Sequence, residues 1–244
     1  MTELEQLVAR AEEAERRLEL ARKSILALSA LTVELARDVG EPGRTRAEEA
    51  PESGEWIQTY SGKKFYPLNP SVEDVDVVDI AHALSLQCRY TGHINTFYSV
   101  AEHSVRVVDA LELAHAHSWG KSAKELRPLL RWGLMHDASE AYLVDVARPV
   151  KRSKTMAPYR EAEDRLMTAI CQRYGLPLEE PPSVKRADVL VGATEARYLF
   201  TNIHPDWVFP VPPMAAPIVP WTPAEAEHRF LECFERLFPT YPVL

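Results

Sequence analysis

From about residue 74 to the end of the chain, apolar side chains recur at the three- and four-residue spacing of α-helices. No alternation of strands and helices and no glycine-rich phosphate loop interrupts this pattern, which disfavours Rossmann and P-loop folds. The sequence therefore predicts an all-α fold, a helical bundle preceded by a short extended arm or β-hairpin at residues 56–66. The expected helices cover about residues 74–88, 98–117, 123–142, 157–174, 183–203 and 223–238.

The N-terminal segment carries a different pattern. From Leu4 to Leu35, apolar and small residues alternate at spacings of three and four, which is heptad spacing sustained over more than four repeats. This pattern predicts one long helix that forms a coiled coil and makes the protein a homo-oligomer; the alternative is that the helix packs back on its own domain. Glycines and a proline at 40–43 end the helix. The predicted organisation is a helix over 1–40, a linker over 41–55 and a folded domain over 56–244.

Charge and composition exclude several classes of protein. The formal net charge of -8 argues against a protein that coats polymeric nucleic acid or an anionic membrane. The sequence contains neither an apolar run of about 18 residues nor the apolar core of a signal peptide, so we expect no membrane segment and a cytoplasmic location. Any phosphate ligand must therefore bind in a pocket where positively charged side chains gather locally.

The adjacent residues His136 and Asp137 follow the apolar stretch 129–135 within an expected helix. Burying an imidazole beside a carboxylate is costly unless a partner satisfies both groups, and a divalent metal ion is such a partner. His103 lies on the apolar face of another expected helix, and Asp188 is flanked by apolar residues on a third. Together these four residues supply two imidazoles and two carboxylates for one divalent ion, and this set of ligands suits Mn, Co, Zn, Fe and Mg to differing degrees. The alternatives are a hydrogen-bonded core histidine for His103 and a helix N-cap for Asp188.

Two further acids follow the His-Asp pair. Glu140 lies three residues after Asp137, so the two carboxylates should share one face of the expected helix, and Asp145 lies near the end of that helix. Paired carboxylates beside a metal ion are typical of phosphoester hydrolysis, where one of them orients or deprotonates the attacking water. The alternative is that these acids lie on a solvated surface.

Basic residues come directly after the acids. Arg148, Lys151, Arg152 and Lys154, together with Arg89, could hold phosphate oxygens. The alternative is an exposed basic loop, which we prefer for Lys154. Arg89 differs from the others because it follows an expected apolar helix and precedes a turn that should face the helix of His103.

Three stretches, 97–104, 136–142 and 184–188, resemble the HD-domain metal-dependent phosphohydrolases. The similarity extends over about residues 55–240 and points to the branch that contains bacterial 5'-deoxynucleotidases and phage dATP triphosphohydrolases. The acid that directly follows the His-Asp pair in guanosine tetraphosphate hydrolases is missing, since Ala138 and Ser139 stand there. The Gly-Tyr-Pro signature of cyclic-di-GMP phosphodiesterases is missing as well.

The resemblance implies an HD-type helical bundle and a role for each candidate residue. It implies that one divalent ion is bound by His103, His136, Asp137 and Asp188. It implies that Glu140 and Asp145 act on the water and the leaving group, and that Arg89 and Lys151 hold phosphate. Candidates for the contact with deoxyribose are Tyr90, His93 and Phe97.

These expectations give three hypotheses about function. The first is a 5'-deoxynucleotidase that releases phosphate from deoxynucleoside monophosphates. The second is a triphosphohydrolase that releases triphosphate from a deoxynucleoside triphosphate such as dATP. The third is a scaffold without catalytic activity, in which the first helix assembles partners and the metal is structural.

Overall fold

The computed structural model describes residues 54–117, 123–241 and 243. The chain divides into two compact units, residues 1–52 and 53–244, and everything described below belongs to the second. The predicted heptad helix over 1–40 and nearly all of the predicted linker over 41–55 lie outside the described residues.

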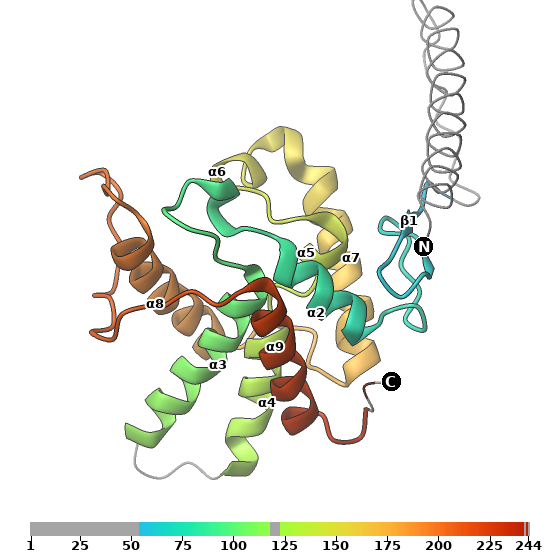
Figure 1. Ribbon diagram of the computed structural model, residues 1–244. Helices are drawn as coiled ribbons and strands as arrows, with labels where there is room; N and C mark the ends of the chain where they lie inside the picture. Colours follow the sequence, from blue (N-terminus) through green and yellow to red (C-terminus); the bar gives the residue numbers. More distant parts are fainter. Residues whose placement is uncertain (1–53, 118–122, 242, 244) are drawn as a thin grey trace, which may run out of the picture. The chain divides into compact units, whose positions relative to one another are not determined.

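Helices form most of the described structure, so the prediction of an all-α fold is confirmed there (Figure 1). The predicted hairpin is also present, as two short antiparallel strands in which Ile57 pairs with Phe65. In chain order the elements are β1 (Ile57–Gln58), β2 (Lys64–Phe65), α2 (Val77–Leu86), the 3-10 helix η1 (Arg89–Gly92), α3 (Val100–His117), α4 (Ala123–Met135), α5 (Glu140–Leu143), α6 (Arg148–Lys151), the 3-10 helix η2 (Lys154–Met156), α7 (Ala157–Tyr174), α8 (Pro182–Leu199) and α9 (Pro223–Leu237).

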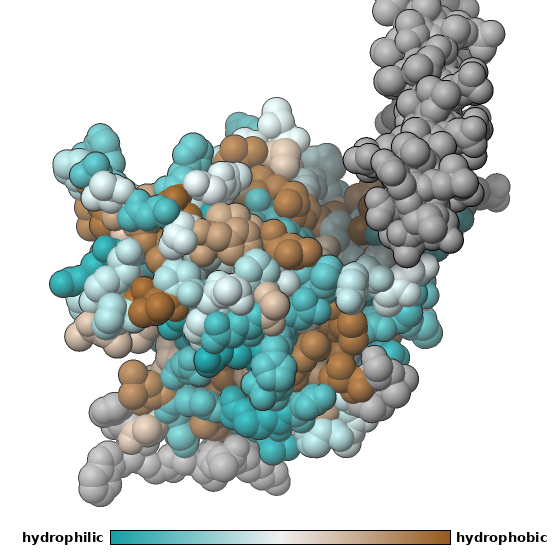
Figure 2. Space-filling model, viewed as in Figure 1, coloured by the Kyte–Doolittle hydropathy of each residue, from teal (hydrophilic) through white to brown (hydrophobic). Residues whose placement is uncertain are grey.

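Helix α3 lies at the centre of the packing, with α2, α4, α8 and α9 against it. Its apolar face buries Val107 and Val108, and α9 contributes Phe230 and Phe234 to the same core. The outer surface of α9 is polar, and Figure 2 shows hydrophilic residues gathered where this helix lies in Figure 1. Among the described residues, no helix is both long enough and apolar enough to cross a lipid bilayer.

Several helices begin and end at residues that the sequence marks locally. The side chain of Asp76 caps α2 by accepting a hydrogen bond from the backbone N–H of Val78, and Thr222 caps α9 in the same way. Helix α7 ends at Gly175, whose φ of 63° is the left-handed conformation that glycine adopts most easily. These signals explain why the expected ranges of α7 and α9 agree with the structure to within one residue.

The prediction of one continuous helix over 123–142 is wrong, because α4 ends at Met135 and a turn precedes α5. The ring of His136 bonds back to the carbonyl of Gly133 through Nδ1, over 2.8 Å. Successive residues of a helix point about 100° apart, so a continuous helix would direct only one member of the His-Asp pair inward. The turn lets both members face the same point. Asp137 and Glu140 therefore do not share the face of one helix.

Candidate metal centre and active-site cleft

Three segments of the chain bring the four predicted metal ligands together. His103 comes from α3 and is fully buried, and His136 and Asp137 come from the turn between α4 and α5. Asp188 lies inside α8, six residues after its first residue, and is therefore no N-cap. The simpler interpretation of Asp188 as a cap is thereby excluded.

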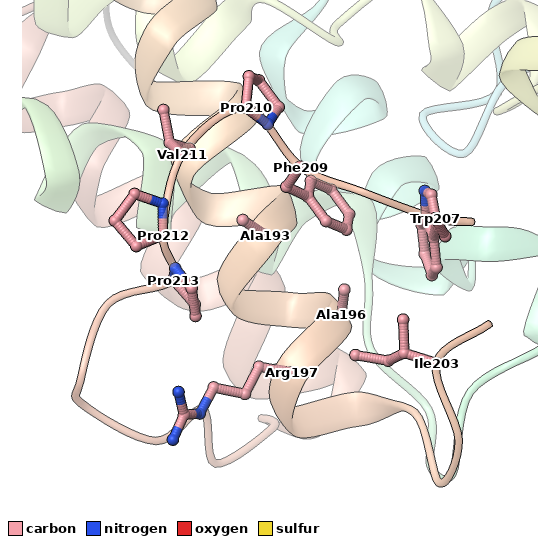
Figure 3. A pocket seen from close by; sticks show the side chains of 10 residues that line it. All are labelled: Ala193, Ala196, Arg197, Ile203, Trp207, Phe209, Pro210, Val211, Pro212 and Pro213. Carbon is pink, nitrogen blue, oxygen red and sulfur yellow. The ribbon is translucent and has the colours of Figure 1, made fainter. Parts of the chain in front are cut away.

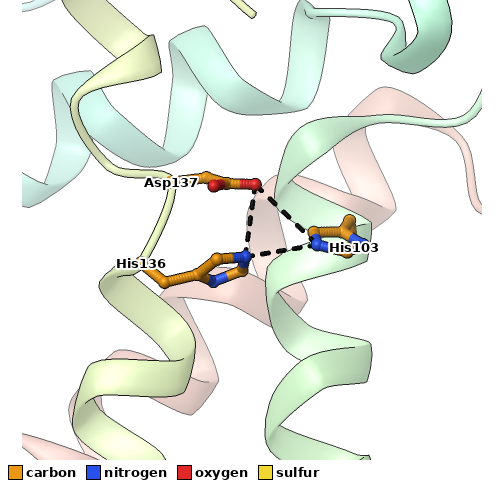
Figure 4. A group of neighbouring side chains, drawn as sticks. All are labelled: His103, His136 and Asp137. Atoms are coloured by element: carbon orange, nitrogen blue, oxygen red, sulfur yellow. Dashed lines mark hydrogen bonds and ion pairs between the residues drawn. The ribbon is translucent and has the colours of Figure 1, made fainter. Parts of the chain in front are cut away.

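The ligand atoms of the histidines and Asp137 point toward one another (Figure 4). The two Nε2 atoms of His103 and His136 lie 3.2 Å apart, and Asp137 Oδ2 is 3.3 Å from the Nε2 of His136. These three residues form a cluster that could hold a metal ion. Asp188 approaches from the side of His103, with its Oδ1 at 3.4 Å from His103 Nε2, while its other oxygen accepts a hydrogen bond from Lys185 at 2.7 Å.

Hydrogen bonds on the far side of each ring fix which nitrogen faces the cluster. His136 Nδ1 lies 2.8 Å from a backbone carbonyl oxygen, which can only accept, so this nitrogen carries the proton. His103 Nδ1 likewise donates to the carboxylate of Glu195 at 2.6 Å. Once both Nε2 atoms are deprotonated they present lone pairs to each other, an arrangement that a cation between them stabilises. Such partners for metal-ligating histidines are common in metalloproteins, so the residues present fit a divalent ion.

The charges around the cluster also favour a cation at this point. Burial and Arg89 act to lower the pKa of His103, but Glu195 and Asp188 outweigh them and raise it to about 9. Burial acts to raise the pKa of Asp188 as well, yet the two histidines and Lys185 hold it well below its usual range. Asp137 behaves in the same way, with its pKa lowered mainly by His136 against the effect of burial. The carboxylates are therefore ionised and available as ligands.

The two predicted catalytic acids lie at the ends of one short segment, and a single side chain holds both ends. The amide of Gln87 donates from Nε2 to the carbonyl of Glu140 at 2.8 Å and accepts at Oε1 from the backbone N–H of Asp145 at 3.1 Å. Gln87 itself is held beside the first turn of α3, because its carbonyl accepts from Val100 N. The acids are thus positioned relative to the helix that carries His103.

Glu140 is buried, and its environment suits a proton acceptor. Its Oε2 is one of two buried side-chain polar atoms without a hydrogen-bond partner among the described residues. Burial raises the pKa of Glu140 well above its usual range, with further contributions from Asp137 and Asp145. Burial also raises the pKa of Asp145, against the opposing effect of Arg89. A buried carboxyl group with a raised pKa can exchange a proton near neutral pH.

The candidate centre opens into a cleft of about 900 Å³. Asp137, Glu140, Asp145 and Asp188 line it, and apolar residues from the segment after α8 complete it. Cationic side chains outnumber these carboxylates among the described residues that line the cleft, in a chain that is acidic as a whole. The cations are Arg89, Arg148, Lys151, Arg152, Arg160 and Lys185.

Four of the five predicted phosphate ligands line this cleft, namely Arg89, Arg148, Lys151 and Arg152. Three of these four are already paired, Arg148 with Asp188 Oδ2 at 3.9 Å. Arg89 donates to Glu195 at 3.2 Å and to Asp137 at 3.4 Å. Lys151 bonds to Glu163 and lies 3.9 Å from Glu140 Oε1. His93 is exposed and lines the cleft, as does Tyr90. Phe97 and Lys154 are not among the lining residues, which agrees with an exposed position for Lys154.

Backbone strain is concentrated beside the cleft. Among the described residues, the non-glycine residues with positive φ are Tyr90, Thr91 and Val144, at 56°, 51° and 67°. Tyr90 and Thr91 line the cleft, and Val144 directly precedes Asp145. Each such residue costs roughly 1–3 kcal/mol, and strain of this kind clusters at functional sites.

The structure adds functional residues that the sequence did not reveal. Glu195 is fully buried and accepts hydrogen bonds from His103, Arg89 and the hydroxyl of Tyr90, the last at 2.6 Å. It lies seven residues after Asp188, which places both on one face of α8 and is the signal that could have found it. Gln87 carries no such signal, because its role depends entirely on tertiary contacts.

The chain was compared with known families and proteins. No family model matches it. It is 34% identical over 186 residues to the uncharacterized protein YfdR of Escherichia coli strain K12, an alignment that spans 75% of this chain and 95% of YfdR. It is also 33% identical over 168 residues to an uncharacterized protein of Rhodobacter capsulatus, across 64% of this chain and 80% of that protein. At this identity and coverage, the chain belongs to the same protein family as YfdR.

Proposed function

We propose that the protein is a metal-dependent phosphohydrolase that removes the 5'-phosphate from deoxynucleoside monophosphates. The observation that carries this proposal is the convergence of the two histidine Nε2 atoms and Asp137 beside the unpartnered oxygen of Glu140. Both groups border a cleft that is rich in cations, as a phosphate ester requires. The resemblance to HD-domain enzymes of deoxynucleotides names the substrate class.

The metal would be held by His103, His136, Asp137 and Asp188. When bound, a divalent ion supplies Lewis acidity, which polarises a phosphoryl oxygen and makes water a better nucleophile near neutral pH. The protein's own contribution to this centre is geometric. Glu195 and the carbonyl of Gly133 fix the two imidazoles so that each presents Nε2 to the ligand site.

The proton transfers are assigned to the two acids held by Gln87. Glu140 accepts a proton from the water whose oxygen attacks the phosphorus, because its Oε2 has no other partner among the described residues and a raised pKa makes its ionised form a stronger base. The bond between phosphorus and the 5'-oxygen breaks, and Asp145 donates a proton to that oxygen. The raised pKa of Asp145 increases the protonated fraction that can do so. The products are a deoxynucleoside and inorganic phosphate.

The cations of the cleft neutralise the phosphate. Arg89 uses two of its five N–H donors for Glu195 and Asp137, so the remaining donors are available for phosphate oxygens. Lys151 lies close enough to Glu140 to limit the pKa rise of that carboxyl group, since its charge lowers the Glu140 pKa. These contacts place positive charge along the cleft and leave Oε2 of Glu140 without a hydrogen-bond partner among the described residues.

A triphosphate substrate is the alternative, and a specific observation favours it. Arg148, Arg152 and Lys185 also line the cleft, and they would suit the tail of a deoxynucleoside triphosphate. In that reaction water attacks the α-phosphorus and triphosphate leaves. Incubation with each dNMP and dNTP in the presence of Mn, Co, Zn, Fe or Mg separates the two reactions, because the products are phosphate in one case and triphosphate in the other.

The decisive variant is Glu140→Gln. We expect kcat to fall by about 10²- to 10⁴-fold, since the amide cannot accept the proton, while the bound metal content is retained. Turnover of the preferred nucleotide and metal content of the same preparation are the two measurements. Glu161→Gln, an exposed change on α7, is the matched control and should leave both unchanged.

Two outcomes would count against this mechanism. Full activity in Glu140→Gln would remove that residue from the chemistry. Absence of hydrolysis in the wild-type protein with every nucleotide and metal would instead favour the scaffold hypothesis, in which the metal is structural.

A further inference from the structure

The segment that follows α8 forms an aromatic wall of the cleft. We call residues 200–213 the strap; none of them lies in a helix or strand. Every strap residue that lines the cleft is apolar or aromatic. The charged residues of the cleft all come from other segments. The strap residues that line it are Phe200, Trp207, Val208, Phe209 and Pro210.

Trp207 is the centre of a group of aromatic rings. Its ring centroid lies 5.1 Å from those of Phe200 and Phe209, and 6.1 Å from that of Tyr90. The contacts with Phe200 and Tyr90 are edge-to-face, with interplanar angles of 78° and 76°. Tyr90 in turn donates from its hydroxyl to Glu195. The aromatic group is therefore connected directly to the residue that orients His103.

Trp207 keeps a large exposed surface in spite of these contacts. It is 38% exposed, and the neighbouring Val208 is 79% exposed. An exposed indole in a cleft offers a flat apolar surface that a planar ring can cover. Stacking of a nucleobase on an aromatic side chain typically strengthens binding by about 5- to 150-fold.

The strap is held at both ends, by the hydrogen bond between Thr201 and Asn95 at its start and by two hydrogen bonds to α8 directly after its last residue. The hydroxyl of Tyr198 donates to Ala215 O at 2.7 Å, and Met214 N donates to Thr194 Oγ1 at 3.0 Å. Between these points a hollow of about 540 Å³ separates the strap from α8, where Ala193 and Ala196 leave space (Figure 3). Trp207, Phe209 and Pro210 border both the hollow and the cleft. The aromatic residues Trp207 and Phe209 of the strap therefore lie between the hollow and the cleft.

We infer that Trp207 and its aromatic neighbours in the strap bind the nucleobase of the substrate by stacking. This inference rests on the proposed function and extends it to base selection. The indole Nε1 is the sole polar side-chain atom that the strap offers to the cleft among the described residues, so the base is recognised by its plane and not by its hydrogen-bonding edge. All four bases are accepted, and purines bind more tightly than pyrimidines because they cover more of the ring.

The test compares a nucleotide with the same phosphate ester lacking a base. The substrates are dAMP and 2-deoxyribose 5-phosphate, and the variants are Trp207→Ala and Trp207→Phe. We expect Trp207→Ala to lower the preference for dAMP, expressed as the ratio of the two kcat/KM values, by about 5- to 150-fold. Trp207→Phe should recover most of that preference. Trp56→Ala changes a tryptophan that is 49% exposed and does not line the cleft, and should leave the ratio unchanged.

The result that would overturn the inference is an unchanged ratio in Trp207→Ala, or a wild-type protein that does not distinguish the two substrates. Failure of the proposed function gives a different result, namely no hydrolysis of either compound with any metal. In that case, calorimetric titration with dAMP and with 2-deoxyribose 5-phosphate still decides whether the aromatic site binds the base. Tighter binding of dAMP that is lost in Trp207→Ala supports the aromatic site, and equal affinities contradict it.

Discussion

Among single residues, Glu195 connects the candidate metal centre to the wall of the cleft. It is fully buried and bonds to His103 at 2.6 Å, to Tyr90 at 2.6 Å and to Arg89 at 3.2 Å. Burial acts to raise the pKa of Glu195, but Arg89 and His103 lower it to about 2, so the group stays ionised. An ionised partner on Nδ1 keeps the Nε2 lone pair of His103 directed at the metal site and increases its basicity.

Replacing Glu195 with glutamine should therefore weaken metal binding without removing a ligand. We expect affinity for the preferred divalent ion to fall by about 10- to 100-fold in Glu195→Gln, as is common for partners of ligating histidines. Competition with a chelator of known affinity measures the change. Glu102→Gln is the matched control, because Glu102 is also fully buried but bonds to Arg106 and Trp221 N, away from the cluster. Equal losses of metal affinity in the two variants would show that disturbing any buried carboxylate is enough.

The candidate metal ligands and their buried partner Glu195 differ in how far the sequence could predict them. His136, Asp137 and Asp188 are polar residues in apolar surroundings, so each calls for a partner and the sequence itself raises the question. Glu195 lies in a helix among alanines, where an acid is equally typical of a solvated face. Its burial follows from the packing of α8 against α3, a long-range contact that local pattern does not encode.

Among the elements, the start of α2 shows how one cap joins several parts of the fold. Asp76 accepts a hydrogen bond from Val78 N at 2.8 Å and pairs with Lys63 of the hairpin at 2.6 Å. Its backbone N–H donates to the hydroxyl of Tyr142 in α5, the helix that begins with Glu140. Loosening this cap should therefore affect the hairpin and the segment that carries the two candidate catalytic acids.

Stability measurements on two variants of Asp76 separate the cap from the charge. Asp76→Ala should reduce the free energy of unfolding at pH 7 by about 1 kcal/mol, the usual value of a lost cap, and Asp76→Asn by less because asparagine also caps helices. Burial acts to raise the pKa of Asp76, but Lys63 and Val78 N lower it below the ordinary 3.8. The charge then stabilises the fold above pH 3.8, and this contribution disappears as the pH falls through the lowered pKa.

Urea denaturation at pH 7, 5 and 3 measures these differences. The gap between wild type and Asp76→Asn should be constant between pH 7 and 5 and smaller at pH 3. A gap that widens on acidification would contradict the direction of the pKa shift. An alanine variant no weaker than the asparagine variant would show that the cap contributes little.

The bounds of a helix could be predicted where capping residues mark its ends. They could not be predicted where tertiary contacts end the helix. Thr222 with Pro223 and the glycine at 175 fixed the bounds of α9 and α7. The end of α4 carries no such marker, because the helix stops where His136 and Asp137 must both turn inward. The turn that directs both side chains inward thus interrupts the helical pattern that surrounds it.

At the scale of the whole molecule, the candidate site is complete within the second of the two units. Every residue assigned to it lies between Gln87 and Pro210, whereas the heptad pattern lies before residue 40. The sequence separates these parts because heptad spacing is a local pattern, while the cleft is lined by residues that lie more than a hundred positions apart in the chain. Catalysis and assembly should accordingly be separable by mutation.

Deletion of residues 1–40 tests this separation. We expect the mass in solution, measured by light scattering, to fall to that of a smaller assembly or a monomer, since heptad helices associate through their apolar positions. The kcat per chain should remain within about twofold, because no site residue is removed. The full-length variant Leu18→Glu with Ile25→Glu changes two heptad positions and should reproduce the loss of mass. An unchanged mass in both variants would reject the coiled coil, and a loss of activity that accompanies dissociation would mean that the cleft needs a second copy of the chain.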